Sequence, residues 1–175
     1  GVERNADIVH MATYAPLLAH VEGWQWRPDL IWFDNLRSVR TCSWYVQNLY
    51  GHNKGTNVIP LTMNKKAVSG QEGQNGLFAS AVLDKENNTY ILKVVNTSDK
   101  SQKLNIEFKG LKKSVSLVNG KCITLHSDNS DAENTLDEPN KIVPVEKDIN
   151  IKKNILNTEI GEMTFAIYKF EISKK

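Results

Sequence analysis

The residues best suited to contact a ligand lie in the first 44 positions of this 175-residue chain, which hold all four tryptophans. Trp32 falls in an apolar run and Trp44 at the start of a helical pattern, so both are expected in a core. Trp24 and Trp26 lie in a connecting stretch. A large aromatic side chain there can stack on a sugar ring or cover the end of a hydrophobic domain, and the sequence leaves both readings open.

Two polar residues, Asp34 and Asn35, come directly after the apolar run Leu30–Phe33. The run is typical of a fully buried parallel strand. Because the carboxyl ends of parallel strands face the ligand crevice, polar residues there are binding candidates, although a capped loop also explains them. The predicted substrate-binding residues are therefore Trp24, Trp26, Asp34 and Asn35.

No motif in the sequence predicts catalysis, a metal site or a cofactor. The four histidines lack the spacing of H-E-x-x-H, and no G-x-S-x-G occurs. The glycine-rich stretch 70–76 lacks the Lys-Ser/Thr of a phosphate loop and is expected to be a flexible connection. Asp128–Asp131 resembles the start of a calcium loop but lacks its glycine and late glutamate, which favours a solvated loop. We expect no catalytic residue, no metal and no cofactor.

Composition excludes two classes of partner. The formal net charge is +2, which gives no field to attract nucleic acid or an anionic membrane. No apolar run approaches the ~20 residues of a membrane span. The two cysteines, Cys42 and Cys122, form neither a metal set nor a disulfide framework, and two buried thiols are favoured over a bridge.

Residues 1–55 predict a helix–strand–helix order. Apolar residues from Ile8 to Leu18 follow helical spacing, with a break expected near Pro16. The strand Leu30–Phe33 comes next, and then a helix over Cys42–Tyr50, capped by Thr41 or Ser43 and ended by Gly51. A parallel strand needs neighbours, and nothing later supplies them in α/β form. We therefore expect the chain to begin inside a larger α/β domain, as the tail of an enzyme.

From Thr56 onward the pattern is that of an antiparallel β-sandwich. The stretches 77–83 and 90–95 predict a hairpin around Asp84–Asn88. Asn119-Gly120 predicts a tight turn, and Pro144 restricts its segment to a sheet edge or a bulge. A change of phase within 163–172 predicts a β-bulge in the last strand. The fold class is thus mainly β, with a sandwich over 56–175 after the segment 1–55.

Three stretches of the first part resemble the end of the barrel in α-L-arabinofuranosidases of glycoside hydrolase family 51: residues 3–7 with 12–18, 26–35, and 43–47. Residues 132–145 are similar to a segment of that family's C-terminal β-domain. The resemblance implies a (β/α)8 barrel followed by a jelly-roll-like sandwich, in a secreted or periplasmic enzyme. Such enzymes remove arabinofuranosyl units from plant polysaccharides with retention, using two glutamates on the fourth and seventh barrel strands.

By the family's pattern both glutamates precede Gly1, and Glu3 belongs to the helix region beyond the nucleophile strand. The resemblance makes Leu30–Phe33 the eighth barrel strand and places Asp34 and Asn35 on the active-site face. We expect this chain to be inactive alone and to meet arabinose-containing polysaccharides or oligosaccharides only through the barrel. Residues 30–50 would expose strand edges that favour self-association. The alternative is a free-standing carbohydrate-binding sandwich, which the lack of tryptophan after Trp44 disfavours.

Overall fold

The computed structural model describes residues 1–174, and its elements are mostly β-strands. In chain order they are η1 (Glu3–Asn5), β1 (Leu18–His20), β2 (Ile31–Phe33), β3 (Ser38–Arg40), α1 (Cys42–His52), β4 (Asn57–Ile59), β5 (Thr62–Met63), β6 (Lys66–Ala67), β7 (Leu77–Asp84), β8 (Thr89–Asn96), β9 (Gln102–Glu107), β10 (Val115–His126), β11 (Val145–Ile149), β12 (Ile155–Ile160) and β13 (Thr164–Lys174). None of the helices within 1–174 is both long and apolar enough to cross a membrane.

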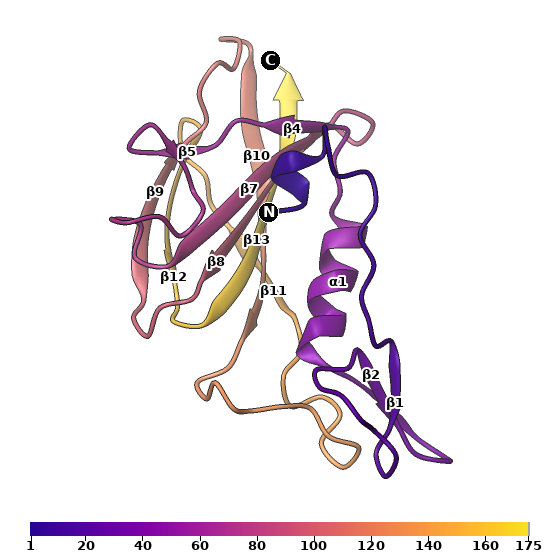
Figure 1. Cartoon of the computed structure of the whole chain (residues 1–175). Helices are drawn as coiled ribbons and strands as arrows, with labels where there is room; N and C mark the ends of the chain where they lie inside the picture. Colours follow the sequence, from indigo (N-terminus) through magenta and orange to yellow (C-terminus); the bar gives the residue numbers. More distant parts are fainter. Residues whose placement is uncertain (175) are drawn as a thin grey trace.

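The centre of the fold is an antiparallel six-stranded sheet in the order β11-β10-β13-β8-β7-β4. One face packs against the pair β9–β12, and α1 and η1 lie on the other face (Figure 1). The predicted antiparallel sandwich is confirmed. Because both faces are covered, the central strands β8 and β13 bury residues of both alternating sets.

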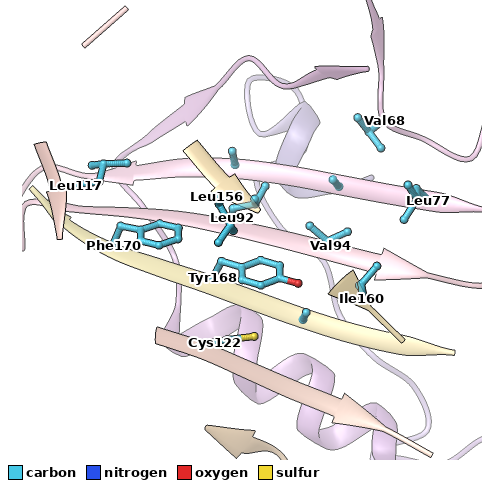
Figure 2. Packing of buried hydrophobic residues seen from close by; sticks show 13 residues of the cluster. Val68, Leu77, Leu92, Val94, Leu117, Cys122, Leu156, Ile160, Tyr168 and Phe170 are labelled. Carbon is cyan, nitrogen blue, oxygen red and sulfur yellow. The ribbon is translucent and has the colours of Figure 1, made fainter. Parts of the chain in front are cut away.

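The sandwich core lies between the six-stranded sheet and β12. Leu92, Tyr168 and Phe170 project from the sheet, and Leu156 and Ile160 face them from β12 (Figure 2). All five side chains are at most 2% exposed. Two further aromatic residues, Tyr90 and Phe108, pack against this core, and Phe108 meets Phe170 edge-to-face with ring centroids 5.5 Å apart.

Helix α1 docks on the opposite face of the same sheet. Tyr45 and Leu49 bury themselves in a cluster that includes Ile167. Tyr50 stacks on Phe165 with ring centroids 5.3 Å apart and planes at 4°. As predicted, Thr41 caps this helix, because its hydroxyl accepts from Trp44 N at 3.3 Å. The helix continues through the predicted stop at Gly51 and ends at His52.

The helix predicted over Ile8–Leu18 is wrong. Within this range only Leu18 is in a regular element, and it begins β1, which runs parallel to β2. The predicted strand Leu30–Phe33 is confirmed as β2, and its parallel neighbour comes before it in the chain. Ile8 is 74% and Met11 84% exposed, so the apolar face of the expected helix has no cover. An amphipathic helix draws most of its stability from such packing.

The predicted hairpin is confirmed as β7 and β8, with Asp84 paired to Thr89. The predicted edge position after Pro144 is also confirmed, because β11 is the outermost strand of the sheet. The tight turn at Asn119-Gly120 is wrong: both residues lie inside β10, where the register against β13 shifts between Val118 and Lys121. The sequence predicted a β-bulge in the last strand. The bulge lies at this pairing, but its extra residue is in the partner strand β10.

Candidate functional site

Trp24, Arg27 and Trp32 form a stacked group at the carboxyl end of the parallel pair β1–β2. The rings of Trp24 and Trp32 meet edge-to-face with centroids 5.8 Å apart. The Arg27 guanidinium lies 5.0 Å from the centroid of each ring. Since cations bind favourably over indole faces, the arginine fixes the orientation of Trp24, which remains 46% exposed.

Asp34 and Asn35 lie in the turn between β2 and β3. Asp34 Oδ1 accepts from the backbone N–H of Leu36 at 2.8 Å and of Arg37 at 2.6 Å, and Arg37 Nε donates to Asp34 Oδ2 at 3.0 Å. These bonds, first that from Leu36 N, hold the pKa of Asp34 below its usual range. Asp34 is therefore an anionic acceptor and does not suit the role of a proton donor. Asn35 is exposed in the same turn.

Trp26 is the most open aromatic side chain of the site, with 63% of its surface exposed. Among residues 1–174, no aromatic or cation–π partner contacts its ring. Its ring is therefore open to solvent. The structure thus brings Trp24, Asp34 and Asn35 to one end of a small sheet, with Trp26 in the adjoining loop.

A segment of the sandwich joins this end of the sheet. The strap, which we define as residues 127–144 between β10 and β11, reaches down beside β1 and β2 (Figure 1). Arg27 pairs with Glu133 at 3.4 Å and Arg37 with Asp137 at 2.8 Å. A hollow of about 200 Å³ lies between the strap and the sheet. Its lining includes Trp24, Arg27, Trp32, Arg37, Glu133 and Asp137.

Glu3 contacts the six-stranded sheet and not the carboxyl end of β1–β2. Its carboxylate pairs with Lys93 of β8 and accepts from Ser80 Oγ at 2.5 Å. Burial lowers the pKa of the Lys93 amine, and the hydrogen bond that Lys93 donates to Glu3 opposes that shift. A carboxylate engaged in this way anchors η1 to the sheet.

The carboxylates of Asp128 and Glu162 come together with His126 at the surface of the sandwich. One ligand atom from each residue lies within 4.8 Å of the other two. His126 Nε2 is 2.8 Å from Asp128 Oδ1, while its Nδ1 contacts Thr164 Oγ1 at 2.9 Å. The Asp128 side chain is 93% exposed, so this carboxylate is open to water.

Both cysteines are thiols without a disulfide, as the sequence favoured. Cys122 is buried in the sandwich core and Cys42 is half-buried at the start of α1. Burial raises the pKa of both thiols, which suppresses the reactive thiolate. Neither residue therefore adds chemistry to the site.

The family described as the alpha-L-arabinofuranosidase C-terminal domain matches residues 1–163. This chain belongs to that family. Alpha-L-arabinofuranosidase 1 of Arabidopsis thaliana is 31% identical over 171 residues, which cover 96% of this chain and 24% of that protein. The extracellular exo-alpha-L-arabinofuranosidase of Streptomyces chartreusis is 52% identical over 60 residues, 34% of this chain and 7% of that protein.

Solved structures share the fold of this chain. The arabinose-bound MgGH51 α-L-arabinofuranosidase superposes with a TM-score of 0.84 at 27% identity, covering 98% of this chain and 26% of that one. The GH51 arabinofuranosidase from Xanthomonas axonopodis pv. citri has the same fold, with a TM-score of 0.76 at 18% identity, over 97% of this chain and 33% of that one. The chain therefore spans about a quarter of the length of the curated relatives that match it from end to end.

Proposed function

We propose that this chain is the non-catalytic C-terminal part of a retaining α-L-arabinofuranosidase. The parent enzyme releases arabinofuranosyl units from plant polysaccharides. The observation that carries the proposal is the match to arabinofuranosidases over nearly the whole chain but only 24% of the relative's length. Retaining hydrolysis needs two carboxyl groups about 5–5.5 Å apart in a cleft, one as acid and one as nucleophile. The remaining three quarters of the enzyme supply that pair.

In this proposal residues 1–55 complete the barrel and residues 56–175 form the accessory sandwich. The parallel pair β1–β2 supports the assignment, since barrel strands are parallel and their carboxyl ends face the substrate. Trp24, Trp26, Asp34 and Asn35 then shape the cleft and perform no chemistry. The partner is an arabinose-containing polysaccharide or oligosaccharide, and the enzyme acts outside the cytoplasm, as the extracellular relative's name supports.

The sandwich itself acts as a structural support for the barrel end. A carbohydrate-binding sandwich presents aromatic faces to the sugar, whereas Phe165, Tyr168 and Phe170 are buried here. Tyr90 and Phe108 are half-buried and pack on the same core. Docking of α1 on the six-stranded sheet gives the barrel end a large covered surface, which fits a role in stability.

The experiment is release of nitrophenol from an aryl α-L-arabinofuranoside by the purified 175-residue chain and by the full-length enzyme. We expect turnover by the full-length enzyme and none by the 175-residue chain. Turnover by the chain that persists through purification would refute its non-catalytic role, and Asp128→Asn and Glu162→Gln would then test the surface carboxylates. A full-length enzyme without activity on arabinofuranosides would refute the function of the parent.

A further inference from the structure

The strap is fixed by a buried side chain to the three-stranded sheet β1-β2-β3, in which β3 pairs antiparallel with β2. Asn134 is 4% exposed, and its Nδ2 donates to Arg40 O at 3.0 Å and to Ile142 O at 2.9 Å. Its Oδ1 accepts from Ile142 N at 2.7 Å. One amide therefore ties two points of the strap to the end of β3, and buried bonds of this kind are costly to break.

Beyond this tie, the strap packs on the sheet through an apolar contact. Leu136 joins the cluster of Ala19, Trp32 and Val39. The strap is therefore held against the sheet at Leu136. Charged residues on both sides of Leu136 form ion pairs with the sheet. Glu133 contacts Arg27, and Asp137 contacts Arg37.

The pair Arg27–Glu133 lies beside Trp24. The Arg27 guanidinium lies over the faces of the Trp24 and Trp32 rings, and Glu133 is its anionic partner at 3.4 Å. The pair is about half exposed, at 53% and 57%, so it contributes little to stability. Its position at the mouth of the hollow gives it a different use, because it sets the charge and shape of that surface.

The chemistry of the hollow suits an uncharged polyol. Guanidinium and carboxylate groups bond neighbouring hydroxyls, while an indole face stacks on the C–H face of a sugar. Two guanidinium groups and two carboxylates line the hollow, so their formal charges cancel and a charged ligand gains no net attraction there. Trp24 and Arg27 come from the barrel end, whereas Glu133 and Asp137 come from the sandwich.

We propose that the strap makes the sandwich part of substrate recognition: Glu133 is a positioning residue that holds Arg27 and Trp24 for a sugar unit beyond the cleavage point. This inference rests on the proposed function of the parent enzyme. It assigns to the accessory domain a share in the choice between long and short arabinose-containing substrates. Asp137 supports the opposite side of the hollow through Arg37.

The test compares Glu133→Gln with Glu146→Gln in the full-length enzyme. Glu146 pairs with Lys121 at 2.8 Å on the sandwich, with side chains 50% exposed, and is the matched control. For an arabino-oligosaccharide, Glu133→Gln raises KM about two- to fivefold with kcat unchanged, the scale of an exposed ion pair. The KM for an aryl arabinofuranoside stays at the native value. Glu146→Gln changes neither.

A second measurement is independent of activity. In the 175-residue chain, the assigned indole N–H resonance of Trp24 shifts in Glu133→Gln and stays in place in Glu146→Gln. An unchanged Trp24 resonance, or equal KM values for the two variants, overturns the inference. If the native full-length enzyme hydrolyses no arabinofuranoside, the proposed function fails, and the Trp24 resonance still decides whether Glu133 positions this group.

Discussion

The contact between η1 and the sheet gives a sharp test of how the two parts of the chain are joined. Lys93 is 1% exposed and Glu3 16%, so the ion pair between them is shielded from water. Lys93 Nζ also lies 5.1 Å from the ring of Tyr50 on α1. Arg4 donates to Val68 O at 2.6 Å and to Ala79 O at 3.2 Å, which holds the segment beside the pair.

Glu3→Ala leaves the Lys93 charge buried without its acid. Removing one partner of a buried pair costs about 3–5 kcal/mol in free energy of unfolding. For a chain of this size the loss corresponds to a fall of roughly 6–20 °C in Tm. The double variant Glu3→Gln with Lys93→Met replaces charge by uncharged groups of similar volume and recovers most of the loss, because no buried charge remains.

Urea unfolding of the 175-residue chain, followed by circular dichroism, measures the free energy of unfolding of these two variants and of a control. Lys121→Met is the control, because its pairs with Glu146 and Asp148 are exposed to water and their removal changes the free energy of unfolding little. If Glu3→Ala costs no more than this control, the ion pair does not anchor η1 in solution. The account of how residues 1–5 join the sandwich would then be wrong.

Three further predictions concern the core, the alkaline limit and the cleft. Leu156→Ala removes a side chain that is 1% exposed and lowers the free energy of unfolding in urea by about 2–5 kcal/mol. Leu36→Ala, at a position 95% exposed, lowers it by less than about 0.5 kcal/mol. Equal losses would contradict the assigned core. Burial raises the pKa of Tyr168 to about 12 from 10.0, so the folded state favours the neutral phenol. Its contribution is complete below pH 10 and is lost as pH rises to about 12, a fall of about 2–3 kcal/mol that Tyr168→Phe abolishes, as denaturant midpoints at each pH would show. Trp26→Ala in the full-length enzyme lowers kcat/KM, by an amount that corresponds to about 1–3 kcal/mol of transition-state binding, and leaves Tm unchanged. A lower Tm with normal kinetics would make Trp26 structural.

Local patterns predicted the elements whose structure depends on near neighbours. The hairpin of β7 and β8 needs only alternation and a turn-forming stretch between them. The Thr41 cap needs only the N–H three residues later. These features are set within a few residues, so sequence reasoning could find them.

The wrong predictions have a common cause, which is contact with distant parts of the chain. Asn119-Gly120 is a strong local signal for a turn, yet a Cβ at Gly120 would lie 2.6 Å from Ile149 O and 2.8 Å from the Phe170 ring. Glycine is needed there because two strands approach it closely, and the resulting bulge keeps β10 continuous. The helix expected over Ile8–Leu18 failed because helical spacing says nothing about which surface covers it.

The candidate site was predicted in part for the same reason. Asp34 and Asn35 follow β2, which the sequence placed, whereas Trp24 and Trp26 follow β1, where the sequence predicted the end of a helix. Arg27 and Arg37 were missed as site residues, because their partners Glu133 and Asp137 are 106 and 100 positions away. The resemblance covered residues 132–145 of the strap but indicated no contact with residues 1–55, and the sequence predicted a solvated loop at its start.

The central claim is that a retaining glycosidase pair belongs to the same enzyme but lies outside this chain. The most direct measurement is covalent labelling of the full-length enzyme with a mechanism-based arabinofuranosyl inactivator, followed by peptide mass spectrometry. The account predicts one adduct, on a glutamate of the barrel outside residues 1–175, because retention proceeds through a covalent intermediate. An adduct on a carboxylate within this chain, or an active enzyme that forms none and inverts the anomeric carbon, would contradict it.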